Sequence, residues 1–599
     1  MNSIDLQNVM EPSVLAKEIA HLWDKWKTDR VFWEEESAAI RQMVFAATIN
    51  TTANSENMTN NRTTIPKAAQ IYDNLLANYD ASIFPNPEWF KFEANSKEAS
   101  NDQKRKVIQN YMKTKTRQSK FRSLIRDELS DWILYGNCFV GADFVREYTI
   151  DPVTDEKVIG YIGPKAYRIS PHDIVFDITA TSFDTAPKII RTLKTLGQII
   201  KEIDTKPELG YTLEMVDRIK KRRSSLVHGS PDIHKIKGLL ADGFSSLSEY
   251  YKSGVVEILE FFGDLYILES GDFKPNHAIT VVDRADIIRD APVKSYNGNH
   301  GIFHSPWRKR PDSLMGMSPL LNLEGMQYRV DKVENTKADI FDLFAHPIIH
   351  EKGDVEFIDG EGTVNGVRGL PGSLYRSDAD GDVQFLQPNP AALNADFQIQ
   401  NYLILMEEMA GAPKNTMGIR TPGEKTAFEV QTLDNAASRI FQNKSAYLEE
   451  EFIEPLLNYM LELSQRNLDA EDYIKVTDDK FGVDTFISIT ADDISAAGKI
   501  YAIGSRVFAA QAILAQNLTT YTQSPLYQDT KQHLDTFKAA QVVEKLLGLE
   551  QFELFRDNVG VEQQVETQRL IQQGQDTLAA EQQTPSSGAM PDEITNPPA

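Results

Sequence analysis

The chain has 599 residues and a formal net charge of −24, from 63 Lys and Arg against 87 Asp and Glu. Hydrophobic residues make up 41% and charged residues 25%, which is ordinary for a folded protein and excludes a wholly disordered chain. The acidic balance argues against a protein that coats DNA by neutralising its phosphates. No run of 18 apolar residues occurs, so the sequence predicts no transmembrane helix.

Residues 11–49, 66–82 and 102–135 have the apolar spacing of helices, with a polar loop at 50–64. The last of these helices is expected to stop at Gly136, before a strand over 139–148. Its first part carries nine basic residues, and two interpretations stay open. They form either a phosphate-contacting face or a surface face complementary to acidic neighbours, and we favour the second because no aromatic residues suggest base stacking. The nine are Lys104, Arg105, Lys106, Lys113, Lys115, Arg117, Lys120, Arg122 and Arg126.

From residue 139 to about 300 the pattern is mixed α/β. A helix is expected near 193–203, and Phe262-Gly263-Asp264-Leu265 has the composition of a hairpin turn. The expected strands are 158–161, 167–169, 174–176, 255–262, 265–269 and 278–282.

Ser318 and Pro319 suit the N-cap and first turn of a helix that is expected to run to Ala345. Residues 347–390 are rich in glycine and short strands, and a second helix is expected over about 391–410. A loop dense in Gly and Pro follows, and then a helix over 426–466 that Pro455 should kink. Beyond it we expect a strand pair at 472–490 and helices near 492–518 and 529–548.

Sequence motifs of enzyme chemistry are missing. Gly498-Lys499 lacks the upstream glycine of a phosphate-binding loop, and no HExxH, GxSxG or GxGxxG occurs. The single cysteine, Cys138, excludes an intrachain disulfide and a multi-cysteine zinc site, and its apolar surroundings predict a buried side chain.

Two weak metal patterns have simpler explanations. His346 and His350 are four residues apart, but Pro347 between them breaks the helix that would aim both at one metal. Asp378, Asp380 and Asp382 imitate the start of a calcium loop, but the required later Gly and Glu are absent, so we interpret them as an acidic turn. We therefore expect no catalytic residue, no metal and no cofactor.

The order of these segments resembles that of tailed-bacteriophage portal proteins, the head–tail connectors, of the short-tailed phage type. The resemblance rests on Gly316-Met317-Ser318-Pro319-Leu320 at the start of a helix, which is similar to the family's G-x-S-P-L. It also rests on Gly411-Ala412-Pro413 after the second helix, which is similar to G-V-P with Ala412 in place of Val. These motifs keep the family's order over about 303–466, and the resemblance weakens before residue 130 and after 490.

The resemblance implies an α+β, mainly helical, elongated fold that assembles as a ring, usually of twelve subunits. Its regions would be the N-terminal helices and α+β wing (1–302), first stem helix (303–346), β-rich clip (347–390), second stem helix (391–411), tunnel loop (412–426), long kinked helix and wing return strands (427–490), helical crown (491–560), and a Gln-rich helix with disordered tail (561–599).

The family's function implies a channel at one capsid vertex for the packaging and ejection of double-stranded DNA. The implied partners are further copies of the chain, the major capsid protein, the packaging ATPase (terminase large subunit) and a tail adaptor protein, with no membrane. The implied location is the virion, and the host bacterial cytoplasm during assembly. The chain itself would not be an enzyme.

Two sets of residues follow from this mapping. Lys414, Asn415, Arg420 and Lys425 would lie in the tunnel loop beside DNA, although an exposed polar loop explains them equally well. The clip would dock the adaptor through Arg368, Tyr375 and Arg376.

Three alternatives remain, namely another structural virion protein such as an adaptor or internal head protein, a metal-dependent nuclease, and a DNA-binding module acting through 104–126. The charge is compatible with the portal interpretation. Copies of −24 each around a ring would repel the DNA backbone, so DNA would slide instead of binding tightly.

Overall fold

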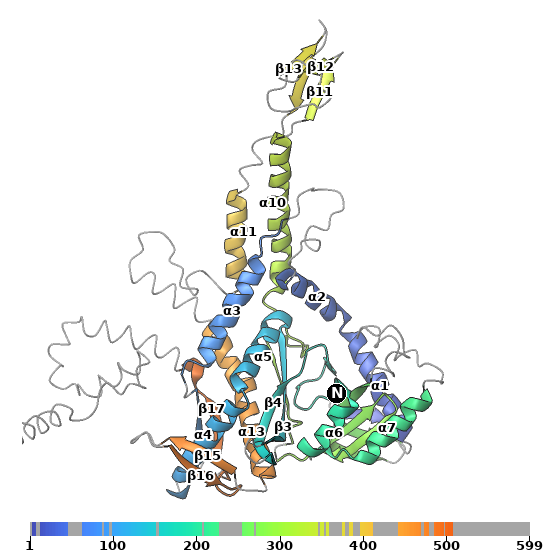
Figure 1. Cartoon of the computed structure of the whole chain (residues 1–599), viewed down its shortest axis with the longest axis vertical. Coiled ribbons are helices and arrows are strands. Elements are labelled where there is room, and N and C mark those ends of the chain that lie inside the picture. Colours follow the sequence, from blue (N-terminus) through green and yellow to red (C-terminus); the bar gives the residue numbers. More distant parts are fainter. Residues whose placement is uncertain are drawn as a thin grey trace, which may run out of the picture. The chain divides into compact units, whose positions relative to one another are not determined.

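The computed structural model describes residues 3–6, 12–45, 63–86, 89–94, 99–150, 155–206, 209–226, 254–268, 271–296, 298–345, 348–352, 355–358, 374–377, 382–386, 396–410, 441–468, 472–477, 484–495 and 498–506. The chain divides into two compact units, Met1–Arg506 and Val507–Ala599, and every described residue belongs to the first. The fold is mixed α+β, about half helical, with several antiparallel sheets (Figure 1). None of the helices in the described ranges has the length and apolar composition that crossing a bilayer requires.

The predicted first helix is two helices, α1 (Pro12–Asp29) and α2 (Val31–Phe45). The break between them lies at Arg30, whose buried guanidinium donates hydrogen bonds to three backbone carbonyl oxygens of the segment 171–174. Tertiary contacts that the local sequence does not show therefore hold the position of this break.

The helix expected at 66–82 is confirmed as α3 (Lys67–Ile83). The helix expected over 102–135 is divided into α4 (Ala99–Gln118) and α5 (Phe121–Tyr135). Lys120 lies between them with a φ of 55°, a left-handed conformation that interrupts the α-helical hydrogen bonding. As expected, α5 ends at Gly136, which also adopts positive φ.

Two antiparallel sheets make up the middle of the first unit. The smaller has the order β10-β3-β4 and the larger the order β5-β6-β7-β8-β9, with β1 added to β7 in parallel. The strands expected at 158–161 and 167–169 form one continuous strand, β4. The elements are β1 (Ser3–Leu6), β3 (Asn137–Ile150), β4 (Lys157–Arg168), β5 (Ile174–Phe176), β6 (Lys188–Thr195), α6 (Leu196–Thr205), α7 (Leu213–Leu226), β7 (Val255–Ile267), β8 (Asp272–Val282), β9 (Asp286–Pro292) and β10 (Ile302–Pro306).

The hairpin turn predicted at 262–265 is wrong. Strand β7 continues through this point, and the pairing with β8 only shifts register between Gly263 and Leu265, as in a β-bulge. A Cβ on Gly263 would lie 2.9 Å from the Cβ of Pro187, so the glycine permits a close approach and does not form a turn. The Asp264 carboxylate accepts a hydrogen bond from the Asn276 amide on β8, which holds the bulge in place.

The largest hydrophobic core joins α3, α4 and α5 to β3 and to the helix at 454–467. The rings of Tyr79, Trp132 and Trp307 meet at its centre, with centroids 4.4 Å apart for the two tryptophans and 5.3 Å from Tyr79 to each. A second core packs α1 against the larger sheet. Each of these two cores therefore brings together residues from widely separated parts of the chain.

The predicted helix after Ser318 begins later than expected. Residues Leu321–Leu323 form a 3-10 turn, and α10 (Glu324–Ala345) follows. Four short strands come next, β11 (Ile348–Lys352), β12 (Val355–Ile358), β13 (Leu374–Ser377) and β14 (Asp382–Leu386), and then α11 (Asp396–Met409). α10 and α11 pack against each other (Figure 1).

The long helix predicted over 426–466 is described from residue 441 onward. It contains a π-helical turn at Glu449–Ile453, followed by α13 (Glu454–Asn467). Pro455 has no backbone N–H to bond the carbonyl four residues earlier, and the wider turn lies immediately before it.

The expected strand pair is confirmed as β15 (Asp472–Thr477) and β16 (Asp484–Ile489). The start of the helix predicted near 492–518 is wrong, because Gly498–Ala502 form strand β17, antiparallel to β2 (Phe90–Ala94). This pairing joins positions about 400 residues apart in the chain, which local propensity does not reveal.

Candidate functional site

The four residues predicted for the tunnel loop lie outside the described residues, and their contact with DNA stays a prediction. They are Lys414, Asn415, Arg420 and Lys425. Arg368, one of the three residues predicted to dock an adaptor, also lies outside. Of the two candidate metal patterns, residues 346–347 and 378–381 fall outside in the same way.

Tyr375 and Arg376, the other predicted docking residues, lie on β13. Their register partners on β12 are Phe357 and Glu356. Strand β11 pairs with β14 antiparallel, so the pair β12–β13 is nested in the sequence inside the pair β11–β14. The whole nested arrangement is inserted between α10 and α11.

The basic side chains of 104–126 do not form a single surface. Lys115 is buried, its ammonium donates a hydrogen bond to the Ile162 carbonyl at 2.6 Å, and it lies 5.2 Å from the ring centroid of Tyr161. Arg122 forms an ion pair with Asp80 at 2.9 Å. These two cations therefore have structural partners. The exposed remainder is divided between α4, α5 and the break between them, and comprises Lys106, Lys113, Arg117, Lys120 and Arg126.

The Gly-x-Ser motif at 316–318, which precedes α10, contacts the end of α5. A Cβ on Gly316 would lie 2.5 Å from the Gly136 carbonyl oxygen and 2.6 Å from Pro306, so only glycine fits. The Ser318 hydroxyl donates a hydrogen bond to the Ile133 carbonyl at 2.7 Å. The same oxygen accepts from the Leu320 amide at 3.0 Å, so Ser318 caps the turn that precedes α10, in the manner that the sequence predicted, and also joins two distant segments.

A ladder of polar side chains lies along the buried face of α10. Gln327, Asp331 and Asn335 are spaced four residues apart and are each at most 1% exposed. They bind the backbone of 63–68, the segment that enters α3, through side-chain oxygens that accept from its amides. The contacts are Thr63 N to Asn335 Oδ1 at 2.6 Å, Ile65 N to Asp331 Oδ1 at 3.1 Å, Ala68 N to Gln327 Oε1 at 3.3 Å, and Gln327 Nε2 to the Ile65 carbonyl at 2.6 Å.

An ion pair extends this contact to the second helix. The Lys67 ammonium at the start of α3 lies 2.5 Å from the carboxylate of Glu407 on α11, and both side chains are largely buried. Arg329 of α10 lies over the ring of Tyr402 on α11, 5.3 Å from its centroid. We did not predict this polar contact from the sequence, although three polar residues at i, i+4 and i+8 on one helix face were its visible signal.

The same two helices expose apolar side chains. Phe397 is 71% exposed and Phe341 is 51% exposed. Large apolar groups exposed on neighbouring helices are typical of a surface that another protein covers. The others on this pair are Tyr328, Leu343, Ile404, Leu405 and Met409.

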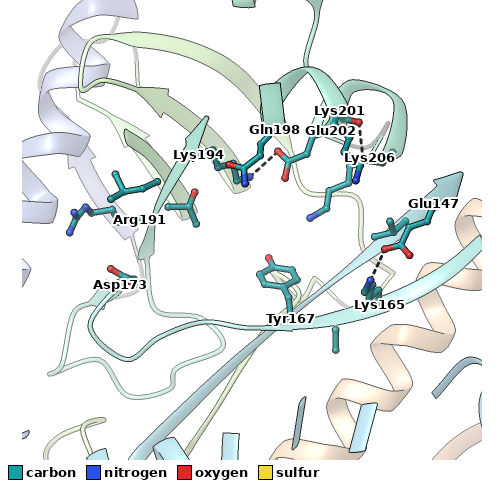
Figure 2. Close-up of a pocket in the computed structure, with 15 residues that line it drawn as sticks. Glu147, Lys165, Tyr167, Asp173, Arg191, Lys194, Gln198, Lys201, Glu202 and Lys206 are labelled. Carbon is teal, nitrogen blue, oxygen red and sulfur yellow. Dashed lines mark hydrogen bonds and ion pairs between the residues drawn. The ribbon is translucent and has the colours of Figure 1, made fainter. Parts of the chain in front are cut away.

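The described region also contains a cavity of ≈ 710 Å³ between β4, β6 and α6, with several charged side chains in its lining (Figure 2). Thr195 and Gln198 form a capping box at the start of α6, in which the Thr195 hydroxyl accepts from the Gln198 amide and the Gln198 side chain accepts from the Thr195 amide. In Figure 2, the Tyr167 side chain rises from β4 toward the cavity, with Lys206 on the opposite side. The Lys206 ammonium lies 5.1 Å from the Tyr167 ring centroid.

Four of the five cations that line this cavity are paired with carboxylates, and the fifth is Lys201. Burial is the largest single influence on the pKa of Lys206 and lowers it. The charge and hydrogen bond of Asp143 at 2.5 Å, together with the charges of Glu202 and Glu260, outweigh burial, so the pKa is raised. Similar pairs join two other lysines and an arginine of the lining to acidic side chains, so an anionic ligand at any of these four cations would have to displace a carboxylate. We therefore interpret the cavity as a structural network of ion pairs. The other pairs are Lys165–Glu147 at 2.5 Å, Lys194–Glu202 at 2.9 Å and Arg191–Glu257 at 3.3 Å.

Cys138 is 1% exposed, and burial raises the pKa of its thiol well above the ordinary value. This agrees with the sequence interpretation of a small buried side chain. Across the ranges that the structure describes, no group of three or more His, Cys, Asp or Glu side chains is placed to hold a metal ion.

Comparison with known proteins gives no relative, since neither a family model nor a curated protein sequence matches this chain.

Proposed function

We propose that this chain is a portal-type protein that forms a ring-shaped channel for double-stranded DNA at a capsid vertex. In this role it would bind copies of itself and the major capsid protein. The packaging ATPase and then a tail adaptor would dock on it in turn. The motifs at 316–320 and 411–413 and their order in the chain are the sequence basis of the proposal.

The structural observation that carries the proposal is the helix pair α10 and α11 with its exposed apolar side chains. Fully burying a Phe or Leu side chain stabilises an assembly by about 1.5–3 kcal/mol. A ring in which α10 and α11 of one copy pack against those of the next would bury Phe341, Phe397 and their neighbours, which are exposed in the single chain. The insertion of nested strand pairs between these helices also agrees with a clip between two stem helices.

The polar ladder supplies the rigidity that a channel wall requires. Buried hydrogen bonds from α10 to 63–68, together with the ion pair from α3 to α11, fix both helices against the same N-terminal helix. A helix held at several points along its length transmits force with little bending, which suits a channel wall.

The decisive experiment is the oligomeric state of the full chain, measured by mass photometry and by negative-stain imaging down the particle axis. We expect closed rings. Phe341→Glu and Phe397→Glu should each abolish them, because a charge would be buried at every contact between copies. The matched control is Phe273→Glu on β8, a phenylalanine whose exposure of 55% lies between those of Phe341 and Phe397, and this change should leave rings intact.

A full-length chain that stays monomeric at all concentrations would contradict the portal proposal and favour another structural virion protein. Nicking of plasmid DNA that EDTA abolishes would instead favour a metal-dependent nuclease. Rings that form equally well in the two α10 and α11 variants would show that the contact between copies lies elsewhere.

A further inference from the structure

The last strand of the first unit is β17. Along one of its edges, the backbone amides bond side-chain oxygens where the carbonyls of a neighbouring strand would otherwise accept them. Its other edge pairs with β2, and the Ile503 amide continues that pairing by donating to the Trp89 carbonyl at 2.8 Å. The amides that point away from β2 belong to Ile500, Ala502 and Ser505. Their acceptors all lie on the helix at 449–458.

The acceptors are Asn458, Glu454 and Glu449. Asn458 Oδ1 accepts from Ile500 N at 2.8 Å, and its Nδ2 donates to the Ile500 carbonyl at 3.0 Å. Glu454 Oε1 accepts from Ala502 N at 3.0 Å. These side chains replace the carbonyls that a neighbouring strand would offer, so the segment 498–505 depends on them for its place.

Glu449 makes the terminal contact of this series. Its Oε1 accepts from Ser505 N at 2.7 Å, and its Oε2 bonds the Ser505 hydroxyl. Both side chains are below 5% exposed. Gly504 permits the approach, because a Cβ there would lie 2.1 Å from the Ile83 carbonyl oxygen and 2.9 Å from Glu449 Oε1.

The π-helical turn sets the spacing of the acceptors. Within it, the amide of Glu454 donates to the carbonyl of Glu449, five residues earlier. Residues five apart across this wide turn take the place of residues four apart in an α-helix, so Glu449, Glu454 and Asn458 follow one another toward β17. Residues 498–506 are the last of the first unit, and the second unit begins at Val507.

We propose that Glu449 is a proton-dependent latch that holds residues 498–506, the end of the first unit, more tightly when protonated than when ionised. As a neutral acid, Glu449 satisfies Ser505 without placing a charge in the interior, with one oxygen accepting from the amide and the O–H donating to the hydroxyl. As a carboxylate it accepts from both, but it carries a buried charge that water stabilises better once the segment is released.

The surroundings of Glu449 favour its neutral, protonated form. Burial raises the pKa of Glu449 to about 7, the Ser505 hydrogen bonds oppose the shift, the Glu454 charge adds to it, and Arg506 opposes it. Lys499 is the charged residue of β17. On β10, which also packs against the π-helical turn, the titratable residue is His304, whose ring bonds the Asn137 side chain. No cation therefore forms a close pair with Glu449 among these described neighbours.

The sign and size of the effect follow from linkage. The ordinary pKa of a glutamate is 4.5 and the latched value is about 7, so the latched state binds more protons in this window. The latched state of residues 498–506 is therefore increasingly favoured as the pH falls from 7 toward 4.5, and it is weakened as the pH rises above 7. Between pH 8 and pH 6 the equilibrium constant for latching should increase about tenfold.

The test is hydrogen exchange of the full chain at pH 6 and pH 8, followed by mass spectrometry and corrected for intrinsic rates. Peptides covering 498–506 should be about tenfold better protected at pH 6, whereas peptides from β7 should not change. Glu449→Gln mimics the neutral acid and should give protection that is the same at both pH values. Glu462→Gln is the matched control, because Glu462 is a buried glutamate of α13 that also accepts a backbone amide, from Tyr296 at 2.6 Å.

The control should retain the pH dependence. Ser505→Ala, which keeps the amide and removes the hydroxyl, should lower the protection at both pH values and covers the case in which Glu449→Gln does not fold. Protection of 498–506 that is independent of pH in the unaltered chain would overturn the proposal. The same pH dependence in Glu449→Gln would overturn it as well, since another group would then be responsible.

Discussion

Replacing Gln327 by methionine tests whether the polar ladder fixes α10. The change keeps the length of the side chain and its helix propensity, so the helix itself should persist. It removes the acceptor for Ala68 N at 3.3 Å, the donor to the Ile65 carbonyl at 2.6 Å and the donor to Asp331 Oδ1 at 3.0 Å.

The expected cost follows from these contacts. The net contribution of one hydrogen bond to folding stability is about 1 kcal/mol. A buried polar group that is left without its partner lowers stability by about 1–3 kcal/mol. Gln327 is 1% exposed, so water does not replace the lost contacts. Some relaxation of 63–68 offsets part of the loss, and we expect the free energy of local unfolding to fall by about 2–4 kcal/mol.

Hydrogen exchange at the amides of 63–68 measures this local free energy directly, and urea unfolding of the full chain gives the global value. Lys332→Met is the control, because Lys332 lies on the exposed side of α10 and should change either value by less than about 0.5 kcal/mol. Unchanged exchange at Ile65 and Ala68 in Gln327→Met would refute the view that the ladder holds this segment.

Two further predictions concern other parts of the chain. Burial lowers the pKa of Lys188 from 10.5 to about 7, so the unfolded state binds more protons and stability should rise with pH above 7. Between pH 7 and pH 9.5 the unaltered chain should gain about 3 kcal/mol in urea unfolding relative to Lys188→Met, and equal pH profiles would contradict the assignment. Deleting residues 414–422 should leave rings intact but impair DNA packaging or retention; loss of the rings would show that the segment is structural.

Local sequence signals predicted the elements with strong periodicity or clear ends. The helix α3, the stop of α5 at Gly136 and the pairing of β15 with β16 follow from such signals. The errors share a cause. Gly263 was interpreted as a turn residue because glycine favours turns, but the close approach of Pro187 is what requires it. The strand β17 exists because β2 and α13 supply partners from distant parts of the chain.

The candidate site divides in the same way. The sequence identified Gly316 and Ser318 as parts of a motif. The structure shows why these residue types are needed, because the Gly136 carbonyl lies against Gly316 and the Ser318 hydroxyl bonds the Ile133 carbonyl. The ladder on α10 was readable as a polar stripe, although its partner segment was not. The nine basic residues of 104–126 were treated as one group, and the left-handed turn at Lys120 together with the burial of Lys115 divides them.

The sequence by itself determined the class of element at each strongly patterned segment, the acidic balance and the order of motifs that resembles portal proteins. These three properties depend on residues close together in the chain or on overall composition, so they can be read without knowing the folded structure. The tertiary structure alone decided which polar side chains are buried together. Gln327 meets residues 63–68, and Glu449 meets Ser505, because folding brings distant backbone amides to side chains whose own neighbours give no sign of them.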